Sequence, residues 1–404
     1  GFGWEMGPYQ MWDALGIDAV RDALAEHEIA VPDWVSSIPS EGFYRDTDVG
    51  IPQVWTPGSG TYEDDPRPAD EWGLTYLKED AANTLWSNDE AALIDVGDGV
   101  ALFEFRSKSN SLGQEVITGG MEAIQTVEED RDLRGMIIGN EGSNFSVGAN
   151  LGEVAMALMM GEVSDLEPFI AKFQEAVFKI RYATKPVVVT THQRVLGGGC
   201  EMTLACPNPV LSAETYIGLV ELGVGLLPAG GGTTMMAAKA AEPGRPSEIQ
   251  PFLRQHFETI AMANVATSAF EARDKHFVDE AAIIVMNDAR RFHVAKHEVI
   301  RLSEQGYRPP AVRTHIPVLG APGRAQFEIA LHQFREGEYV SDYDKYLGQR
   351  LAYVMTGGDL TAPAEVHEDY LLELEREVFL SLLGEEKTMA RIQSILTTNK
   401  PLRN

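Results

Sequence analysis

A glutamate stands directly after a run of three glycines near the middle of the chain. Residues 187–206 read VVVTTHQRVLGGGCEMTLAC, so that an apolar β-branched run leads through Gly197–Gly199 to Cys200 and Glu201. Glycine lets the backbone approach a ligand closely, and the start of a helix offers free N–H groups and attracts negative charge. A buried glutamate is costly, so this pairing indicates a site that uses both residue types. A tight strand-to-helix turn without any function explains the glycine triplet alone equally well.

Two further segments repeat this combination of glycines and acidic residues. NFSVGANLGE (Asn144–Glu153) places a glycine turn after a predicted buried strand, and YIGLVELGVGLLPAGGGTTMM (Tyr216–Met236) contains a second glutamate, Glu221, 20 residues after Glu201. Neither the triplet nor these segments is a phosphate-binding signature: no G-x-G-x-x-G follows a strand, and no Gly-Lys-Ser/Thr follows the glycines.

The elements that must position these residues alternate between strands and helices. From residue 91, AALIDVGDGVALFEF consists of two alternating runs around Asp98-Gly99, which predicts a β-hairpin. The pattern then predicts a helix over Leu112–Val127, a buried strand over Leu133–Asn140, a helix over residues 165–182 and a strand over Val187–Thr191. This alternation predicts an α/β fold with a parallel sheet and right-handed crossovers. Beyond Pro228 the chain is predicted to be mostly helical.

The first part of the chain has a different character. Residues 1–50 are rich in aromatic residues, among them Trp4, and a helix is predicted from Gly7 with Pro8 at its first position. Residues 51–70 contain four prolines and several acidic residues without periodicity, which predicts a linker. The first residue is glycine and residues 1–20 resemble the interior of a domain, so we expect the sequence to be a fragment of a longer protein.

Composition excludes several classes of function. The 404 residues are enough for two folding units, and the formal net charge of −28 disfavours binding to nucleic acid or to an anionic membrane surface. No apolar run approaches the ~20 residues that span a bilayer. The two cysteines, Cys200 and Cys206, are expected to be reduced core thiols in a cytoplasmic protein. His293 and His297 have helical i, i+4 spacing but no third ligand, so no metal site is predicted.

The three glycine segments together resemble the crotonase family, the enoyl-CoA hydratases and isomerases. NFSVGANLGE is similar to the family's A-F-S-x-G-A-D-L turn, LGGGCEM to its G-G-G-x-E helix start, and VELGVGLLPAGGGT to its P-E-x-x-x-G-x-x-P-x-x-G-G-T stretch. The chain departs from these patterns at Asn150, Pro207 and Val220, and none of these departures removes a proposed catalytic group. The resemblance implies the ClpP/crotonase β-β-α spiral core, followed here by a mostly helical C-terminal region.

The resemblance also assigns candidate catalytic groups. Ala149 and Gly198 match the two backbone N–H donors of the family's oxyanion hole, and Glu201 and Glu221 match its two carboxylates. Addition of water to an enoyl thioester places enolate charge on the carbonyl oxygen, and losing one amide donor to such an oxygen typically costs ~10²–10³ in rate. One carboxylate accepts a proton from water and the other supplies a proton to the α carbon. Two carboxylates close together in a poorly solvated site do not both ionise easily, so one is expected to stay neutral.

The main hypothesis is therefore an enoyl-CoA hydratase that acts on a CoA thioester. A Δ3-Δ2 enoyl-CoA isomerase using one of the same carboxylates is the first alternative, and retention of both glutamates favours the hydratase. The second alternative is a non-catalytic module for acyl-CoA binding or assembly. RSKSNSL (Arg106–Leu112) matches a family region in which a basic residue can lie near the CoA phosphates, so Lys108 and then Arg106 are candidates to bind CoA; a solvated turn is an equal alternative for Lys108.

Both ends of the chain resemble bacterial bifunctional β-oxidation proteins. GFGWEMGPYQMWDALG is similar to the helical C-terminal domain of 3-hydroxyacyl-CoA dehydrogenases, and residues 375–404 are similar to the end of the bifunctional chains. The resemblance implies a dehydrogenase remnant over residues 1–50, a linker over 51–84 and a crotonase-like domain over 85–404. No cofactor is expected in this fragment, and NAD is expected only in the part upstream. Relatives form trimers, so a homo-oligomer is possible.

Overall fold

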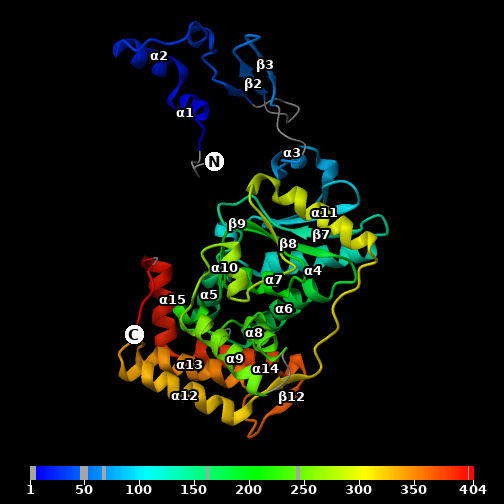
Figure 1. Cartoon of the computed structure of the whole chain (residues 1–404), viewed down its shortest axis with the longest axis vertical. Coiled ribbons are helices and arrows are strands. Elements are labelled where there is room, and N and C mark those ends of the chain that lie inside the picture. Colours follow the sequence, from blue (N-terminus) through cyan, green and yellow to red (C-terminus); the bar gives the residue numbers. More distant parts are fainter. Residues whose placement is uncertain (1–5, 46–52, 66–69, 161–162, 243–245, 399) are drawn as a thin grey trace. The chain divides into compact units, whose positions relative to one another are not determined.

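The computed structural model describes residues 6–45, 53–65, 70–160, 163–242, 246–398 and 400–404 (Figure 1). The chain divides into two compact units. One consists of Gly1–Glu71 with Thr75–Ala81, and the other of Trp72–Leu74 with Ala82–Asn404. No described helix is both long enough and apolar enough to cross a membrane.

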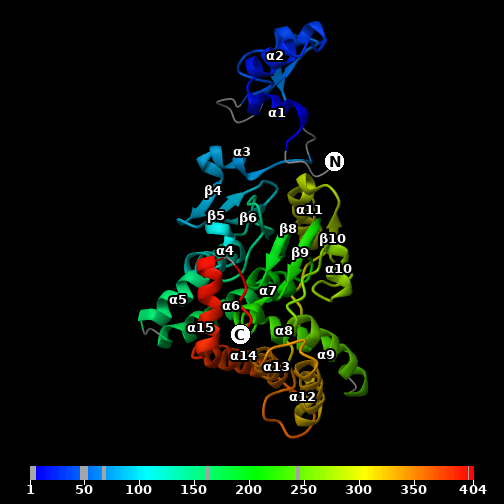
Figure 2. The same cartoon turned by 90° about the vertical axis from the view of Figure 1, so that its left-hand side faces the viewer.

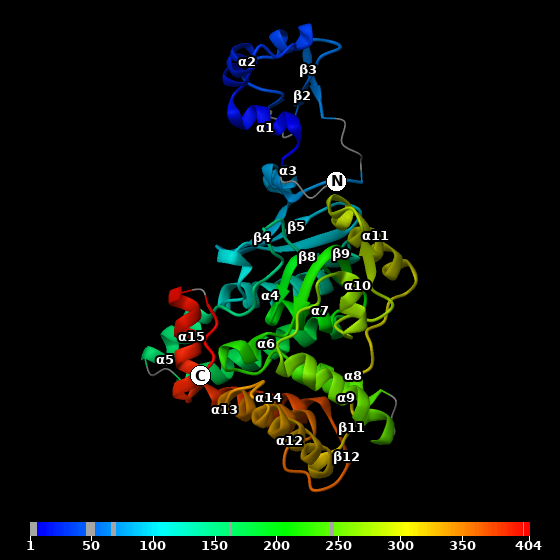
Figure 3. The ribbon, with the colours of Figure 1, turned by 60° about the vertical axis from the view of Figure 1, so that its left-hand side comes forward.

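The first unit combines short helices with a small sheet. Its elements are α1 (Pro8–Leu15), α2 (Ile17–Glu26), η1 (Asp33–Ser37), β1 (Tyr44–Arg45), β2 (Gln53–Thr56) and β3 (Thr61–Asp64), and α3 (Leu74–Glu79) follows. Pro8 occupies the first position of α1, as predicted. Phe43 and Trp55 lie in the buried core of this unit, to which Ile17 of α2 and Val35 of η1 also contribute. Figure 3 shows α1, α2, β2 and β3 of this unit. Trp4 lies outside the described residues.

The structure corrects the predicted linker over residues 51–84. β2 and β3 form an antiparallel pair joined to β1, and Trp55 is only 3% exposed. The strands have four residues each, too few for an alternating pattern to be recognised among the prolines. The first compact unit therefore extends beyond residue 50, and residues 66–69 lie outside the described residues.

The second unit contains a seven-stranded mixed sheet in the order β10-β9-β8-β7-β6-β5-β4. These strands are β4 (Thr84–Ser87), β5 (Ala91–Asp95), β6 (Val100–Phe105), β7 (Gly135–Ile138), β8 (Val187–Leu196), β9 (Val210–Gly218) and β10 (Ile283–Val285). β5 and β6 form the predicted hairpin around Asp98, and the pairings from β6 to β10 are parallel. The α/β prediction is confirmed.

Helices cover both faces of this sheet (Figures 1 and 3). α4 (Gln114–Glu129) packs against β5, β6 and β7, and α11 (Arg291–Glu304) packs against β7, β8 and β9. Successive residues of β7 face the helices on opposite sides of the sheet. A Cβ on Gly135 would lie 2.8 Å from Val299 of α11, whereas Met136 belongs to the core that contains Ile124 of α4. α5 (Leu151–Met160) and α6 (Val163–Tyr182) connect β7 to β8, and α7 (Gly198–Ala205) connects β8 to β9.

The chain beyond Pro228 is mostly helical, as predicted. It forms α8 (Gly232–Ala241), α9 (Pro246–Ala261), α10 (Ala269–Asp274), α11, α12 (Gly320–Glu336), α13 (Asp342–Met355), α14 (Glu368–Leu383) and α15 (Glu386–Thr398), with a two-stranded sheet of β11 (Ile316–Val318) and β12 (Ala364–Val366). α14 packs against α6 and α8, and α15 packs against α5 and the 3-10 turn η4 (Glu221–Val224) (Figure 2). The last two helices therefore contact the elements that carry the candidate site.

Candidate active site

Glu201 lies in the first turn of α7, where the glycine pattern predicted a helix start. Gly197 caps this helix with φ 55°, and Glu201 is 2% exposed. Its Oε1 accepts hydrogen bonds from the backbone N–H groups of Gly230 and Gly232, both at 2.8 Å. A Cβ on Gly232 would lie 2.8 Å from that oxygen, so glycine permits the close approach. Burial raises the pKa of Glu201 to about 7, although the two amides favour its charged form.

Glu221 approaches the same place from another element. It begins η4, a 3-10 turn after β9, and Gly225 ends this turn in the left-handed region with φ 84°. Its Oε2 is buried without a hydrogen-bond partner among the described residues. Burial, followed by the negative charges of Glu201 and Glu375, raises the pKa of Glu221 well above its usual range. An unpartnered buried oxygen favours the neutral acid.

The turns that carry Ala149 and Gly198 lie against each other. A parallel bridge joins Ser146 to Val195, and a Cβ on Gly148 would lie 3.5 Å from the Gly198 nitrogen. Gly148 itself has φ 96°, a backbone conformation that favours glycine. Among the hydrogen bonds that join described residues, the N–H groups of Ala149 and Gly198 donate none. Both amides are thus available to an oxygen atom of a ligand.

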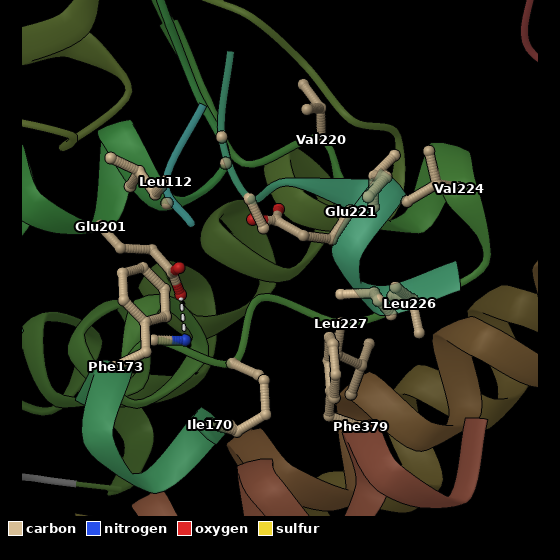
Figure 4. Close-up of a pocket in the computed structure, with 18 of the residues that line it drawn as sticks. Leu112, Ile170, Phe173, Glu201, Val220, Glu221, Val224, Leu226, Leu227 and Phe379 are labelled. Carbon is tan, nitrogen blue, oxygen red and sulfur yellow. Dashed lines mark hydrogen bonds between the residues drawn. The ribbon is translucent and has the colours of Figure 1, made fainter. Parts of the chain in front are cut away.

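One cavity of about 120 Å³ brings the four candidate residues together. Glu201 and Glu221 turn their carboxyl groups into it from opposite sides (Figure 4). Its other walls are almost entirely apolar and include Leu112, Ile117, Val154, Phe169, Ile170, Phe173, Val224, Leu226, Leu227 and Phe379. An apolar cavity that displays two carboxyl groups and two free amides can hold an acyl chain and polarise a carbonyl group next to it.

Helix α14 contributes to this cavity, although nothing in the sequence indicated it. Phe379 of α14 forms part of the cavity wall, and Glu375 of the same helix binds the turn that holds Glu201. Both residues have the pattern of an ordinary amphipathic helix, and their role depends on packing against segments more than 100 residues away. No local pattern could have identified either one.

The two basic candidates for CoA binding lie outside the cavity wall. Lys108 begins the short 3-10 turn η3 (Lys108–Asn110) and is exposed, four residues before Leu112 of the cavity. Arg106 is also exposed, and its guanidinium donates a 2.8 Å hydrogen bond to the Asn88 carbonyl oxygen. Lys108 is therefore the better placed of the two to reach a ligand from solvent.

The two cysteines are free and buried, and the nearer one to the cavity is not reactive. Cys200 and Cys206 are both free and buried, as expected of reduced core thiols. Burial, together with the charges of Glu221 and Glu201, raises the pKa of Cys200 well above its usual range, so it is a poor nucleophile. Within the described part of the chain, no group of three potential metal ligands comes together.

Burial of these carboxyl groups makes stability depend on pH. Burial raises the pKa of Glu201 to about 7, above its ordinary value of 4.5, so the folded protein retains a proton that the unfolded chain releases. The proton on Glu201 therefore contributes fully to the free energy of unfolding below pH 4.5, and this contribution is lost as the pH rises through about 7. We expect Glu201→Gln to raise the melting temperature relative to wild type more at about pH 8 than at about pH 5. Calorimetry at both pH values checks this, and an equal difference at both would contradict it.

Part of this chain matches a protein family, and the whole chain has curated relatives. Residues 95–243 match the family model described as enoyl-CoA hydratase/isomerase. A protein of Bacillus subtilis named as a probable 3-hydroxyacyl-CoA dehydrogenase is 38% identical over 100% of this chain and 50% of its own length. The peroxisomal bifunctional enzyme of Cavia porcellus is 32% identical over 34% of this chain and 18% of its own length.

The chain thus spans about half the length of its curated relative from Bacillus subtilis. Among solved structures, an enoyl-CoA hydratase from Bacillus halodurans aligns with 76% of this chain and 100% of its own, at 16% identity and a TM-score of 0.48.

Proposed function

We propose that this chain adds water across the double bond of a trans-2-enoyl-CoA. The premise is that residues 95–243 are a crotonase module of the enoyl-CoA hydratase/isomerase family. The observation that carries the proposal is the apolar cavity that contains Glu201, Glu221, Ala149 and Gly198. The similarity to a probable 3-hydroxyacyl-CoA dehydrogenase supports a place for this reaction in β-oxidation, which we propose to take place in the cytoplasm.

The different surroundings of the two glutamates suggest their roles. Glu201, whose Oε1 accepts two amide hydrogen bonds, is the better site for negative charge and acts as the base. Glu221, with an unpartnered buried oxygen, holds its proton and acts as the acid. The water oxygen bonds to the β carbon and its proton passes to Glu201; the π electrons of the double bond shift toward the thioester oxygen, and the α carbon then takes a proton from Glu221.

The two free amides stabilise the charge that this reaction creates. As the β carbon is attacked, negative charge accumulates on the thioester carbonyl oxygen. The N–H groups of Ala149 and Gly198 are fixed in two adjoining turns, so they require no reorganisation when that charge appears. The apolar wall excludes water and strengthens these interactions.

Loss of the conjugated absorbance of crotonyl-CoA on addition of the purified chain tests the proposal directly. Chromatography should identify 3-hydroxybutyryl-CoA as the product, and a longer trans-2-enoyl-CoA should be tested in parallel because pocket depth sets the preferred chain. Migration of the double bond in a 3-enoyl-CoA without hydration would instead support an isomerase. Binding of acyl-CoA with neither reaction would support a non-catalytic module.

Lys108 is proposed to hold the phosphate end of CoA. A ligand that carries phosphates needs a local positive charge on a chain with net charge −28. We expect Lys108→Ala to raise KM for the enoyl-CoA severalfold and to change kcat little, because this contact is the same in the ground and transition states. Steady-state kinetics provide the check, with Lys275→Ala as the control, because Lys275 follows helix α10 and does not line the cavity. A fall in kcat at unchanged KM would refute the assignment.

The dehydrogenase activity implied by the names of the relatives is assigned to sequence that this chain does not contain. No G-x-G-x-x-G follows a strand in residues 1–404, and the Bacillus subtilis relative is about twice as long. We therefore propose that NAD binds elsewhere in a longer protein and that this chain needs no cofactor for hydration.

A further inference from the structure

A third buried carboxylate lies directly behind the turn that holds Glu201. Glu375, on α14, is fully buried. Its Oε1 accepts the Gly231 N–H at 2.6 Å, and its Oε2 accepts both the N–H and the hydroxyl group of Thr234 at 2.8 Å. The reaction proposed above makes no use of this group, and residue 375 lies beyond the matched residues 95–243.

The hydrogen bonds of Glu375 interleave with those of Glu201 along three successive amides. Gly230 and Gly232 donate to Glu201, while Gly231 between them donates to Glu375. Gly231 is bonded directly to Gly230, and its Cα lies in the same planar peptide unit as the Gly232 N–H, so a shift of Gly231 disturbs the donors of Glu201. The turn therefore couples the position of the two carboxylates, although they lie on different helices and are far apart in sequence.

The last helix, α15, holds the turn that carries Glu221. On α15, the hydroxyl group of Thr388 donates to the Gly225 carbonyl oxygen at 2.7 Å, and the Arg391 guanidinium donates to the Leu222 carbonyl oxygen at 3.0 Å. Thr388 and Arg391 are both almost completely buried. α14 and α15 thus reach the supporting turns of both carboxylates.

From these contacts we propose that Glu375 is a positioning residue for Glu201, through which the C-terminal helices complete the catalytic site. The proposal rests on the proposed hydratase function for its kinetic consequences. It predicts that Glu375 fixes the two amide donors of Glu201 without touching the substrate, so that loss of Glu375 affects turnover rather than binding.

Glutamine at this position tests the chemistry with little change of shape. Each carboxyl oxygen of Glu375 accepts a backbone N–H, whereas an amide has one acceptor and one donor group. In Glu375→Gln, either the Gly231 N–H or the Thr234 N–H must face an NH₂ group, and the turn must move to relieve this clash. Glu368→Gln is the matched control, because Glu368 is a buried carboxyl group on the same helix that accepts one hydrogen bond, from the Tyr182 hydroxyl group at 2.8 Å.

We expect Glu375→Gln to lower kcat with crotonyl-CoA about 10- to 100-fold, the size of effect that a small misplacement produces, with KM within about threefold of wild type. In a Glu201→Gln background the same change should lower kcat by less than about threefold, because the group that it positions is already lost. Glu368→Gln should behave as wild type. Thr234→Val removes the hydroxyl donor to Glu375 and should lower kcat severalfold, and this loss should shrink in the Glu201→Gln background. If Glu375→Gln does not fold, Thr234→Val tests the positioning role in its place.

A crystal structure of Glu375→Gln provides a readout that does not depend on activity. The proposal predicts that the Gly230–Gly232 turn and the Glu201 carboxyl group are displaced, and that both stay in place in Glu368→Gln. An undisplaced Glu201, a wild-type kcat, or an equal loss in both backgrounds would overturn the proposal. Absence of hydration by the wild-type chain with any trans-2-enoyl-CoA would refute the proposed function instead, and the crystal structure would still decide the role of Glu375.

Discussion

Glu201→Gln should lower kcat for hydration of a trans-2-enoyl-CoA by at least about 100-fold, the lower range for loss of a general base. The amide oxygen of this variant can still accept the hydrogen bonds of Gly230 and Gly232, so the turn is expected to stay in place. What the variant loses is the capacity to take a proton from water. A lower kcat in Glu201→Gln than in wild type therefore reports the loss of proton transfer rather than a change in the shape of the cavity.

Binding of the thioester should survive this change. The Ala149 and Gly198 amides and the apolar wall are untouched, so titration calorimetry with a saturated acyl-CoA should give an affinity close to that of wild type. Glu368→Gln, with its buried carboxyl group outside the cavity, is the control for the general effect of removing such a group. Activity within a few fold of wild type would exclude Glu201 as the base.

Glu221→Gln should also lower kcat by at least about 100-fold, because the α carbon then lacks its proton donor. Burial first, and the charge of Glu201 second, raise the pKa of Glu221 well above its usual range, so these surroundings favour the protonated acid that the reaction needs. An amide group in its place occupies the same space but is not an acid. Steady-state hydration and double-bond migration should both be measured on this variant.

Full hydratase activity in Glu221→Gln would refute the paired roles. If this variant kept double-bond migration while Glu201→Gln abolished it, the isomerase would replace the hydratase as the best account. The rates of hydration and of double-bond migration by the wild-type chain are the reference values against which both variants are compared.

The parts of the site that the sequence predicted are those that local chemistry determines. The apolar β-branched run before the glycines favours a buried strand, and Gly197–Gly199 favour a turn into a helix, so β8, α7 and Glu201 follow from neighbouring residues. The hairpin around Asp98 is similarly local, since Gly97 and Gly99 supply the positive φ values of a tight turn. The assignment of Ala149 to an oxyanion hole depended on the family resemblance rather than on any local rule.

The parts that the sequence did not predict depend on contacts between distant segments. β8 runs on to Leu196 because its last residues pair with Thr215–Gly218 of β9, and no residue within the strand indicates that partner. The burial of Trp55 in a small sheet requires β1, β2 and β3 to assemble around it. Glu375 is recognisable only once α14 packs against α8, when its carboxyl group meets the turn before that helix.

The central claim is that Glu201 and Glu221 act as one acid–base pair, and the double variant Glu201→Gln/Glu221→Gln tests it most directly. The measurement is kcat for crotonyl-CoA hydration by wild type, both single variants and the double variant, with acyl-CoA binding confirmed for each. Groups that act as a unit are non-additive, so the account predicts that the double variant loses much less than the product of the two single losses. A double variant whose loss equals that product would contradict the account, because the two carboxyl groups would then act independently.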